Sequence, residues 1–296
     1  MILETLVLSI FNHDTAIASA AARMVSASSG RPLIEMGSRR THEQAAVAAA
    51  RAAYIAGFFS SSNLEAQRTY GVPARGTSAH AFTLVHTAAS GPDEVAAFRA
   101  QVDALGVGTT LLVDTYDVEQ GIKNAITVGL EMRERGERLS GIRIDSGDLA
   151  YLSKRVRKML DEAGLPDCKI VVSNSLDEFT VTSLLGQGAC IDSFGIGERL
   201  ITAKSEPVFG AVYKLAAVGE NGEFAPRIKV SENVEKITNP GRKKLYRIYD
   251  ENGHAIADLI TLEEEKLDMS KPYRYIDPQK PWKRRYFTNC TAKELQ

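Results

Sequence analysis

The sequence predicts an α/β protein with a parallel sheet, followed by a smaller β-rich region. Strand-like and helix-like segments alternate from residue 32 to about residue 215, which is typical of a parallel sheet closed as a barrel or left open. From residue 212 onward, short segments with period-two alternation are separated by turns rich in Gly, Asn and Pro, as in an antiparallel sheet. We therefore expect a helical lead-in over residues 1–30, an α/β barrel catalytic domain over residues 31–215 and a β-rich C-terminal appendage over residues 216–296.

The composition is that of an ordinary soluble globular protein, with 44% apolar and 25% charged residues. The formal net charge of -1 gives no general attraction for nucleic acid or for an anionic membrane, so we expect neither partner. Cys168, Cys190 and Cys290 are far apart and form no CxxC pair, which argues against a disulfide framework or a zinc site and fits a reducing cytoplasm. No apolar run approaches the roughly 20 residues that span a bilayer.

In the first part of the chain, the apolar residues 1–11 read as an amphipathic helix, and Asp14 is expected to begin a helix that runs through Met24 and ends near residues 28–30. Residues 32–36 form the first strand. Thr41 and Gln44 have the spacing of a capping box for an Ala-rich helix that ends near Gly57. Residues 58–63 are expected to be a polar turn that opens a short helix ending at residue 70.

The next segments continue the same alternation. Strands are expected over residues 109–113, 141–144, 169–173 and 189–194, and helices over residues 92–105, 118–135, 151–163 and 177–185. Asp148 or Ser146 can cap the helix that follows the second of these strands. In the C-terminal region we expect strands over residues 212–216, 227–230 and 244–249, then loops and a short helix in the last thirty or so residues.

Five turns that follow strands have unusual polar content: residues 37–40, 76–80, 114–117, 143–148 and 195–199. In a parallel barrel the carboxyl ends of the strands lie at one face, so five such turns would converge on one cavity. The sequence therefore predicts a site at that face.

The turn at residues 143–148 contains the most informative pair. Arg143 and Asp145 are two positions apart on a strand, so their side chains lie on the same side, and Arg143 could hold a substrate carboxylate with two hydrogen bonds. Asp145 suits vicinal sugar hydroxyls or Mg²⁺; the alternative is a helix cap, which Asp148 could provide unaided.

Two other features point to ligand binding but can also be explained by a purely structural role. His80 lies among small residues that leave room for a ligand, although a lone histidine is more often a satisfied structural residue. Gly195 and Gly197 are spaced as in a phosphate-binding loop, although a GxG alone is also a simple tight turn.

Taken together, eight motifs in this order resemble the nicotinate phosphoribosyltransferase family. The similarity runs from about Leu3 to about Arg247. The motifs are EMGSRR (residues 35–40), SSN (61–63), GTSAH (76–80), VDTYD (113–117), GIRIDSGD (141–148), SNSLD (173–177), FGIG (194–197) and VYKL (212–215).

The resemblance implies a TIM-like α/β barrel of the type II phosphoribosyltransferases, joined to a smaller β-rich domain that is incomplete here. It implies that nicotinate and phosphoribosyl pyrophosphate give nicotinate mononucleotide and pyrophosphate, with hydrolysis of ATP through a phosphohistidine at His80. Mg²⁺ would be carried by the pyrophosphate, with no protein ligand, and the protein would be a homodimer in the cytoplasm that serves NAD salvage.

The same resemblance implies roles for individual residues. Arg143 would pair with the nicotinate carboxylate, and Asp145 would hold the ribose hydroxyls. Arg39 would contact the base or the phosphates. The remaining substrate-binding positions would be Ser62, Asn63 and Thr77, and the 5′-phosphate pocket would be lined by Asn174, Ser175, Gly195 and Gly197.

Two departures from the family pattern leave alternatives open. Met36 stands where an aromatic residue is expected to stack on the pyridine ring, and methionine stacks less specifically. The family's N-terminal segment is absent, so the chain is expected to be an enzyme, an inactive fragment, or a subunit that needs a second polypeptide. A related nicotinamide or quinolinate enzyme is a further alternative. His80 argues against a quinolinate enzyme, which needs no phosphorylatable histidine. Ser62 and Asn63 argue against a nicotinamide enzyme, because neither provides a carboxylate to accept a hydrogen bond from the amide N–H.

Overall fold

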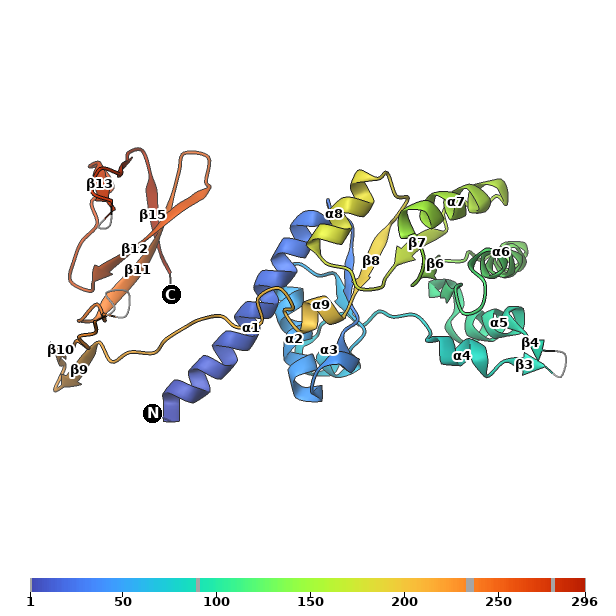
Figure 1. Ribbon diagram of the computed structural model, residues 1–296, viewed down its shortest axis with the longest axis horizontal. Coiled ribbons are helices and arrows are strands. Elements are labelled where there is room, and N and C mark those ends of the chain that lie inside the picture. The colour runs from blue at the N-terminus through green and yellow to red at the C-terminus, as the bar shows by residue number, and fades with distance from the viewer. Residues whose placement is uncertain (1, 89–90, 233–236, 278–279, 296) are drawn as a thin grey trace. The chain divides into compact units, whose positions relative to one another are not determined.

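The computed structural model describes residues 2–88, 91–232, 237–277 and 280–295. The chain divides into two compact units, Met1–Ala211 and Val212–Gln296 (Figure 1). Within the described residues, no helix is both long enough and apolar enough to cross a membrane.

The first unit is built on a six-stranded parallel sheet with the strand order β2-β1-β8-β7-β6-β5. The sheet is a half-barrel in which β2 and β5 are the two edges, and the predicted α/β class is confirmed. Its strands are β1 (Leu33–Glu35), β2 (Ser60–Ser61), β5 (Thr110–Leu112), β6 (Gly141–Ile144), β7 (Lys169–Val172) and β8 (Ser193–Ile196).

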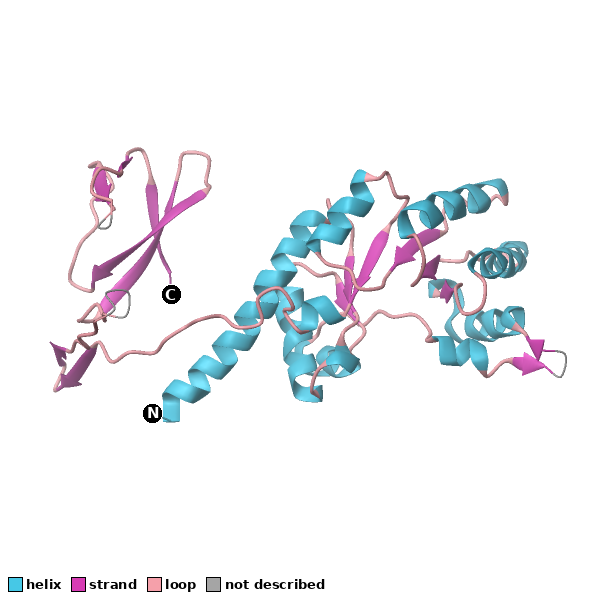
Figure 2. Cartoon of the chain, in the orientation of Figure 1, coloured by secondary structure: helices cyan, strands magenta, loops and turns pink. Residues whose placement is uncertain are grey.

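Helices connect successive strands, as Figure 2 shows, and neighbouring helices pack in the order α5, α6, α7, α8, α1, α2. This order follows the strands of the half-barrel, as expected when each strand is followed by a helix that returns along the sheet. The helices are α1 (Ile2–Ala27), α2 (Glu43–Ile55), α3 (Leu64–Tyr70), α4 (His80–Leu84), α5 (Glu94–Leu105), α6 (Val118–Glu134), α7 (Leu149–Glu162), α8 (Glu178–Gly186) and α9 (Glu198–Ile201). Short elements complete the unit: η1 (Ser38–Arg40), η2 (Gly106–Gly108), β3 (Thr87–Ala88) and β4 (Gly91–Pro92).

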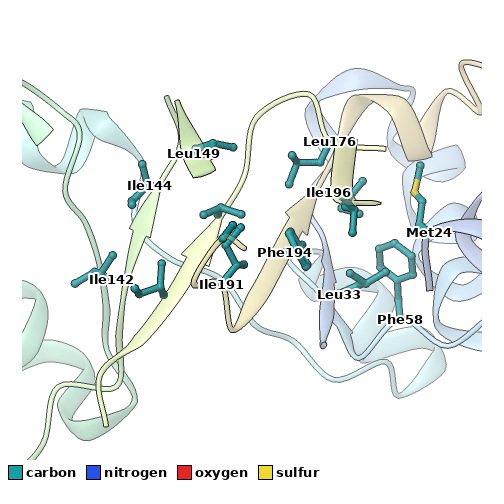
Figure 3. Close-up of a cluster of buried hydrophobic side chains, with 14 of the residues drawn as sticks. Met24, Leu33, Phe58, Ile142, Ile144, Leu149, Leu176, Ile191, Phe194 and Ile196 are labelled. Atoms are coloured by element: carbon teal, nitrogen blue, oxygen red, sulfur yellow. The ribbon is translucent and has the colours of Figure 1, made fainter. Parts of the chain in front are cut away.

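The hydrophobic core lies between the sheet and these helices. Leu33, Phe58 and Phe194 are buried on and around β1 and β8, and Ile142 and Ile144 are buried on β6 (Figure 3). Apolar residues identify these strands in the sequence: residues 170–172 form a continuous apolar run in β7, whereas Ile142 and Ile144 alternate with Arg143 in β6. The core therefore fixes the strands whose carboxyl ends carry the polar turns.

Among the described residues of this unit, aspartate or asparagine side chains cap five helices. The carboxylate of Asp148 accepts a hydrogen bond from the Tyr151 amide at 3.0 Å, which confirms the predicted cap of α7. A side-chain cap satisfies an amide that has no partner within the helix. The other caps of this kind are Asn63 for α3, Asp93 for α5, Asp117 for α6 and Asp177 for α8.

Replacing Asp148 with alanine is expected to lower the free energy of unfolding by about 1 kcal/mol, because the first amides of α7 lose their acceptor. Urea denaturation followed by circular dichroism would measure the change. Lys158→Ala, on an exposed position of the same helix, is the matched control and should change stability by less than about 0.5 kcal/mol. Equal effects of the two variants would contradict the capping role.

Several expected boundaries in the first unit are wrong. Helix α1 is continuous from Ile2 to Ala27, so Asp14 lies inside the helix and does not cap it. Its Oδ2 lies 3.7 Å from Nη1 of Arg51 in α2, and the carboxylate therefore forms an ion pair with that helix. The cap of α2 is His42, whose ring accepts from the Gln44 amide, and not Thr41. The expected polar turn at residues 58–63 contains strand β2, because its backbone pairs with β1.

Strand β8 is also displaced from the prediction. It begins at Ser193 and continues through Gly195 and Ile196, where a turn was expected. The apolar residues 189–191 that suggested an earlier start precede the strand; Ala189 and Ile191 are buried in the core. Burial without strand pairing therefore produced the misleading pattern.

The second unit consists of small antiparallel sheets: β9 with β10, the sheet β12-β11-β15, and β13 with β14. The expected strand at residues 244–249 is confirmed as β11, whereas residues 212–216 and 227–230 are not strands. Among the described residues after 266, strands alternate with the expected loops and turns, whereas the expected short helix is wrong, because no described residue there is helical. The bounds are β9 (Ala217–Glu220), β10 (Glu223–Pro226), β11 (Lys243–Tyr249), β12 (Ala255–Leu262), β13 (Tyr273–Ile276), β14 (Arg284–Phe287) and β15 (Thr291–Leu295).

Candidate active site

Two adjoining cavities lie at the carboxyl ends of the parallel strands in the first unit. The larger cavity has a volume of about 470 Å³ and the smaller about 170 Å³. They share four lining residues, so they form one continuous site: Met36, Arg39, Arg143 and Asp145. The larger cavity is otherwise lined by Ser38, Ser62, Gly76, Thr77, Ser78, Ala79, His80, Ala81 and Leu112, and the smaller by Arg40, Ser173, Asn174, Ser175, Gly195, Gly197 and Glu198.

Arg143 is held at the wall that both cavities share. Its Nε donates to Ser173 Oγ at 2.8 Å, its Nη1 to Thr77 Oγ1 at 2.9 Å and its Nη2 to Asp145 Oδ1 at 2.9 Å. A guanidinium carries five N–H donors, so one donor remains on each terminal nitrogen. The pairing with Asp145 also shows that the two side chains lie on the same side of β6, as the alternation of the strand requires.

Asp145 is held by the adjacent strand ends on either side of β6. Its Oδ1 accepts from Ser173 Oγ as well as from Arg143, and its backbone amide donates to Asp114 Oδ2 at 2.8 Å. The Ser146 hydroxyl donates to the same Asp114 oxygen at 2.6 Å. Asp145 Oδ2 takes part in none of these bonds, so this oxygen remains to accept from a ligand.

Asp114 follows β5 and is a buried acid that was not among the predicted site residues. Its side chain is 1% exposed, and its Oδ1 has no hydrogen-bond partner among the described residues. The polar turn after residue 113 was the available signal, but the sequence does not show which of its carboxylates turns inward.

His80 is the first residue of α4, and its ring is 41% exposed. Nδ1 lies 3.2 Å from Thr115 Oγ1, while Nε2 lies 4.0 Å from Asp114 Oδ1 and 3.9 Å from Asp145 Oδ2. Nε2 therefore faces two carboxylates at the edge of the larger cavity. The structure thus brings the turns at residues 76–80, 114–117 and 143–148 together.

A buried carboxylate supports the turn that carries Arg39 and Arg40. Glu35 is at the end of β1, and its side chain accepts hydrogen bonds from the Gly37 amide and from Ser61 Oγ, the latter at 2.5 Å. Burial raises the pKa of the Glu35 carboxyl above its ordinary value, and the two hydrogen bonds oppose this shift only in part. The carboxyl group therefore ties the turn after β1 to β2.

Glu35→Gln is expected to remove a pH dependence of stability. Below the ordinary pKa of 4.5 the carboxyl is neutral in both the folded and the unfolded state, so it makes no difference to stability. As the pH rises from there through the raised pKa of the folded state, the unfolded carboxyl ionises freely, whereas the folded state must ionise a buried group. The free energy of unfolding of the wild type therefore falls relative to that of the variant. Urea unfolding of both proteins between pH 4.5 and about pH 8 measures this difference. A difference that is constant, or that rises with pH, would contradict the raised pKa.

Asn63 is the one predicted site residue that lines neither cavity. Its side chain caps α3 through the Ala66 amide and donates to Ser38 Oγ at 3.0 Å. Asn63 therefore supports the turn after β1 through Ser38 without reaching either cavity, whereas its neighbour Ser62 lines the larger cavity.

The smaller cavity is shaped by unusual backbone at the ends of β7 and β8. Asn174 and Ser175 have positive φ angles of 99° and 48°, a conformation that is uncommon for residues with side chains. A Cβ on Gly195 would lie 2.7 Å from Met36 Sδ, and one on Gly197 would lie 2.9 Å from the Met36 carbonyl oxygen. The expected loop at Gly195 is wrong, because this glycine lies in β8 and makes room for Met36.

No constellation of metal ligands accompanies these residues. Across residues 2–88, 91–232, 237–277 and 280–295, His, Cys, Asp and Glu side chains nowhere gather in threes with the geometry of a metal site. The site instead combines arginines, hydroxyls and two carboxylates. The arginines can donate hydrogen bonds to anions, and the carboxylates can accept them from sugar hydroxyls.

The chain is similar to known proteins over most of its length. The chain is 62% identical over 221 residues to nicotinate phosphoribosyltransferase pncB1 of Mycobacterium tuberculosis, which covers 74% of this chain and 48% of the relative. It is 44% identical over 299 residues to the nicotinate phosphoribosyltransferase of Bacillus subtilis, which covers 99% of this chain and 59% of the relative. The chain thus spans about half the length of these curated relatives.

The fold is similar to that of a solved relative, and two family models match the chain. The crystal structure of human nicotinic acid phosphoribosyltransferase superposes with a TM-score of 0.80 at 27% identity, over 98% of this chain and 64% of the human one. The model of the nicotinate phosphoribosyltransferase (NAPRTase) family matches residues 32–245, and the model of the nicotinate phosphoribosyltransferase C-terminal domain matches residues 242–296. The chain therefore belongs to the nicotinate phosphoribosyltransferase family.

Proposed function

We propose that this chain carries the site that joins nicotinate to phosphoribosyl pyrophosphate, giving nicotinate mononucleotide and pyrophosphate. The observation that carries the proposal is Arg143, a cation with two uncommitted N–H donors at the wall between the two cavities. A guanidinium binds a carboxylate through two parallel hydrogen bonds, which suits the carboxylate of nicotinate.

The smaller cavity suits the 5′-phosphate of the second substrate. Arg39 and Arg40 line it, together with Asn174 and Ser175. Arginine binds phosphate by charge and by hydrogen bonding, and Gly195 and Gly197 line the same cavity. The larger cavity then receives the pyridine ring, with Met36 as an apolar contact and Ser62 and Thr77 as polar ones.

Catalysis in this reaction depends on position and charge. As the bond between the ribose and pyrophosphate breaks, positive charge develops on the sugar, and the free oxygen of Asp145 would hold the ribose hydroxyls and stabilise that charge. The nicotinate ring nitrogen is the nucleophile, so no general base is needed. Mg²⁺ would arrive with the pyrophosphate and screen its charge.

We also propose that ATP phosphorylates His80 at Nε2. Nδ1 lies within hydrogen-bond distance of Thr115, so a proton held on Nδ1 leaves the lone pair of Nε2 for the γ-phosphorus of ATP. The N–P bond forms as the bond to the bridging oxygen breaks and ADP leaves. The ring becomes more positive in this step, and the carboxylates of Asp114 and Asp145 within 4.0 Å of Nε2 would stabilise it.

An assay of the purified chain with nicotinate, phosphoribosyl pyrophosphate and Mg²⁺, with and without ATP, tests the proposal. Formation of nicotinate mononucleotide that ATP stimulates is the expected result. Binding of both substrates without turnover would favour the alternative of an inactive chain or of a subunit that needs a second polypeptide or a second copy. Preferential use of nicotinamide or quinolinate would assign the site to a related transferase.

A further inference from the structure

Ser173 occupies a fixed position between Arg143 and Asp145, two side chains of the site with opposite charges. It follows β7 directly, and its backbone amide donates to the Ile144 carbonyl at 3.0 Å, so the parallel pairing with β6 extends to this residue. The residue is 3% exposed. Its hydroxyl contacts Arg143 Nε on one side and Asp145 Oδ1 on the other.

The chemistry of the three groups determines where the hydroxyl proton lies. Ionised Asp145 only accepts hydrogen bonds, and Arg143 only donates them. A serine hydroxyl has one proton and two lone pairs, so the proton goes to Asp145 and a lone pair faces the Nε–H of Arg143. The hydroxyl therefore joins a donor to an acceptor, a role that alanine cannot take.

The same contacts determine which donors of Arg143 remain. Ser173 and Asp145 occupy Nε and one N–H of Nη2, and Thr77 occupies one N–H of Nη1. We propose that Ser173 is a positioning residue that fixes the rotation of the Arg143 guanidinium, so that the remaining N–H on each terminal nitrogen is presented to the carboxylate of the pyridine substrate. This role rests on the proposed function.

The neighbouring strand restricts the position of Ser173 further. A Cβ on Gly195 would lie 3.3 Å from Ser173 Cβ, so β8 packs closely against this residue. The hydroxyl therefore has little freedom to follow Arg143 if the guanidinium rotates. Removing it should free Nε and let the guanidinium turn about its long side chain.

The test compares Ser173→Ala with Ser153→Ala. Ser153 is a matched control because its hydroxyl is also buried and hydrogen-bonded, to the Ala150 carbonyl and the Cys190 amide, but it lines neither cavity. Calorimetry would give the dissociation constants for nicotinate and for phosphoribosyl pyrophosphate. Ser173→Ala should raise the constant for nicotinate about tenfold, with a smaller change for phosphoribosyl pyrophosphate, and Ser153→Ala should change neither.

A spectroscopic measurement separates this inference from the proposed function. In proton–nitrogen NMR spectra, the Nε–H of Arg143, assigned by its absence in Arg143→Lys, should be protected from exchange in the wild type and in Ser153→Ala but exposed in Ser173→Ala. If the wild type binds no nicotinate while this signal still depends on Ser173, the proposed function fails and the positioning of Arg143 stands. Unchanged nicotinate affinity in Ser173→Ala, or equal losses for both ligands, would overturn the positioning role.

Discussion

Replacing Arg143 with lysine is expected to raise the dissociation constant for nicotinate by about two orders of magnitude and that for phosphoribosyl pyrophosphate by less than about tenfold. Lysine keeps the charge but cannot offer two parallel donors from one plane, and it cannot reach Ser173, Thr77 and Asp145 together. Titration calorimetry with each ligand separately would measure the two constants.

Arg155→Lys provides the control for this experiment. Arg155 is a half-exposed arginine of α7 that pairs with Glu119, and it lines neither cavity. Its replacement should leave both constants unchanged. If Arg143→Lys weakened both ligands equally, Arg143 would serve the general integrity of the site and not the recognition of the carboxylate.

Replacing His80 with alanine is expected to abolish the stimulation of turnover by ATP while some ATP-independent turnover remains. The ring is the proposed phosphate acceptor, whereas Arg143 and Asp145, which are proposed to bind the substrates, hold each other without it. Initial rates with and without ATP would show the loss. Incubation with γ-labelled ATP should give acid-labile protein label in the wild type and none in the variant.

His86→Ala is the matched control for the histidine. His86 belongs to the same segment, contacts the Phe82 carbonyl through Nδ1 and lines neither cavity. It should keep both the stimulation and the label. Persistence of ATP stimulation in His80→Ala would show that the phosphate acceptor lies elsewhere.

Local patterns predicted the features that depend on neighbours in sequence. The two-residue spacing of Arg143 and Asp145 is enough to place them on one side of a strand, and Asp148 at the start of a periodic segment is enough to predict a cap. The alternation of strands and helices was enough to predict a parallel sheet. Whether that sheet closes is a property of its edges, which no local pattern describes.

The supporting residues of the site could not be predicted in this way. Ser173 and Asp114 act on residues about thirty positions away, and only the register between β5, β6 and β7 brings them together. Gly195 was read as part of a turn because the sequence does not show its packing against Met36, which directly follows β1 far earlier in the chain. Local pattern thus identifies candidate chemistry, and sheet register determines which groups meet.

The pairing of β1 with β8 has a consequence for the synthesis of the protein. Leu33 pairs with Phe194, so the two strands are separated by about 160 residues of chain. At roughly 5–20 residues per second, a ribosome needs on the order of ten to thirty seconds to make that interval. During this time β1 has only the two-residue strand β2 as a partner. The smaller cavity takes its walls from both β1 and β8, and it is therefore among the last parts of the first unit to form on the nascent chain.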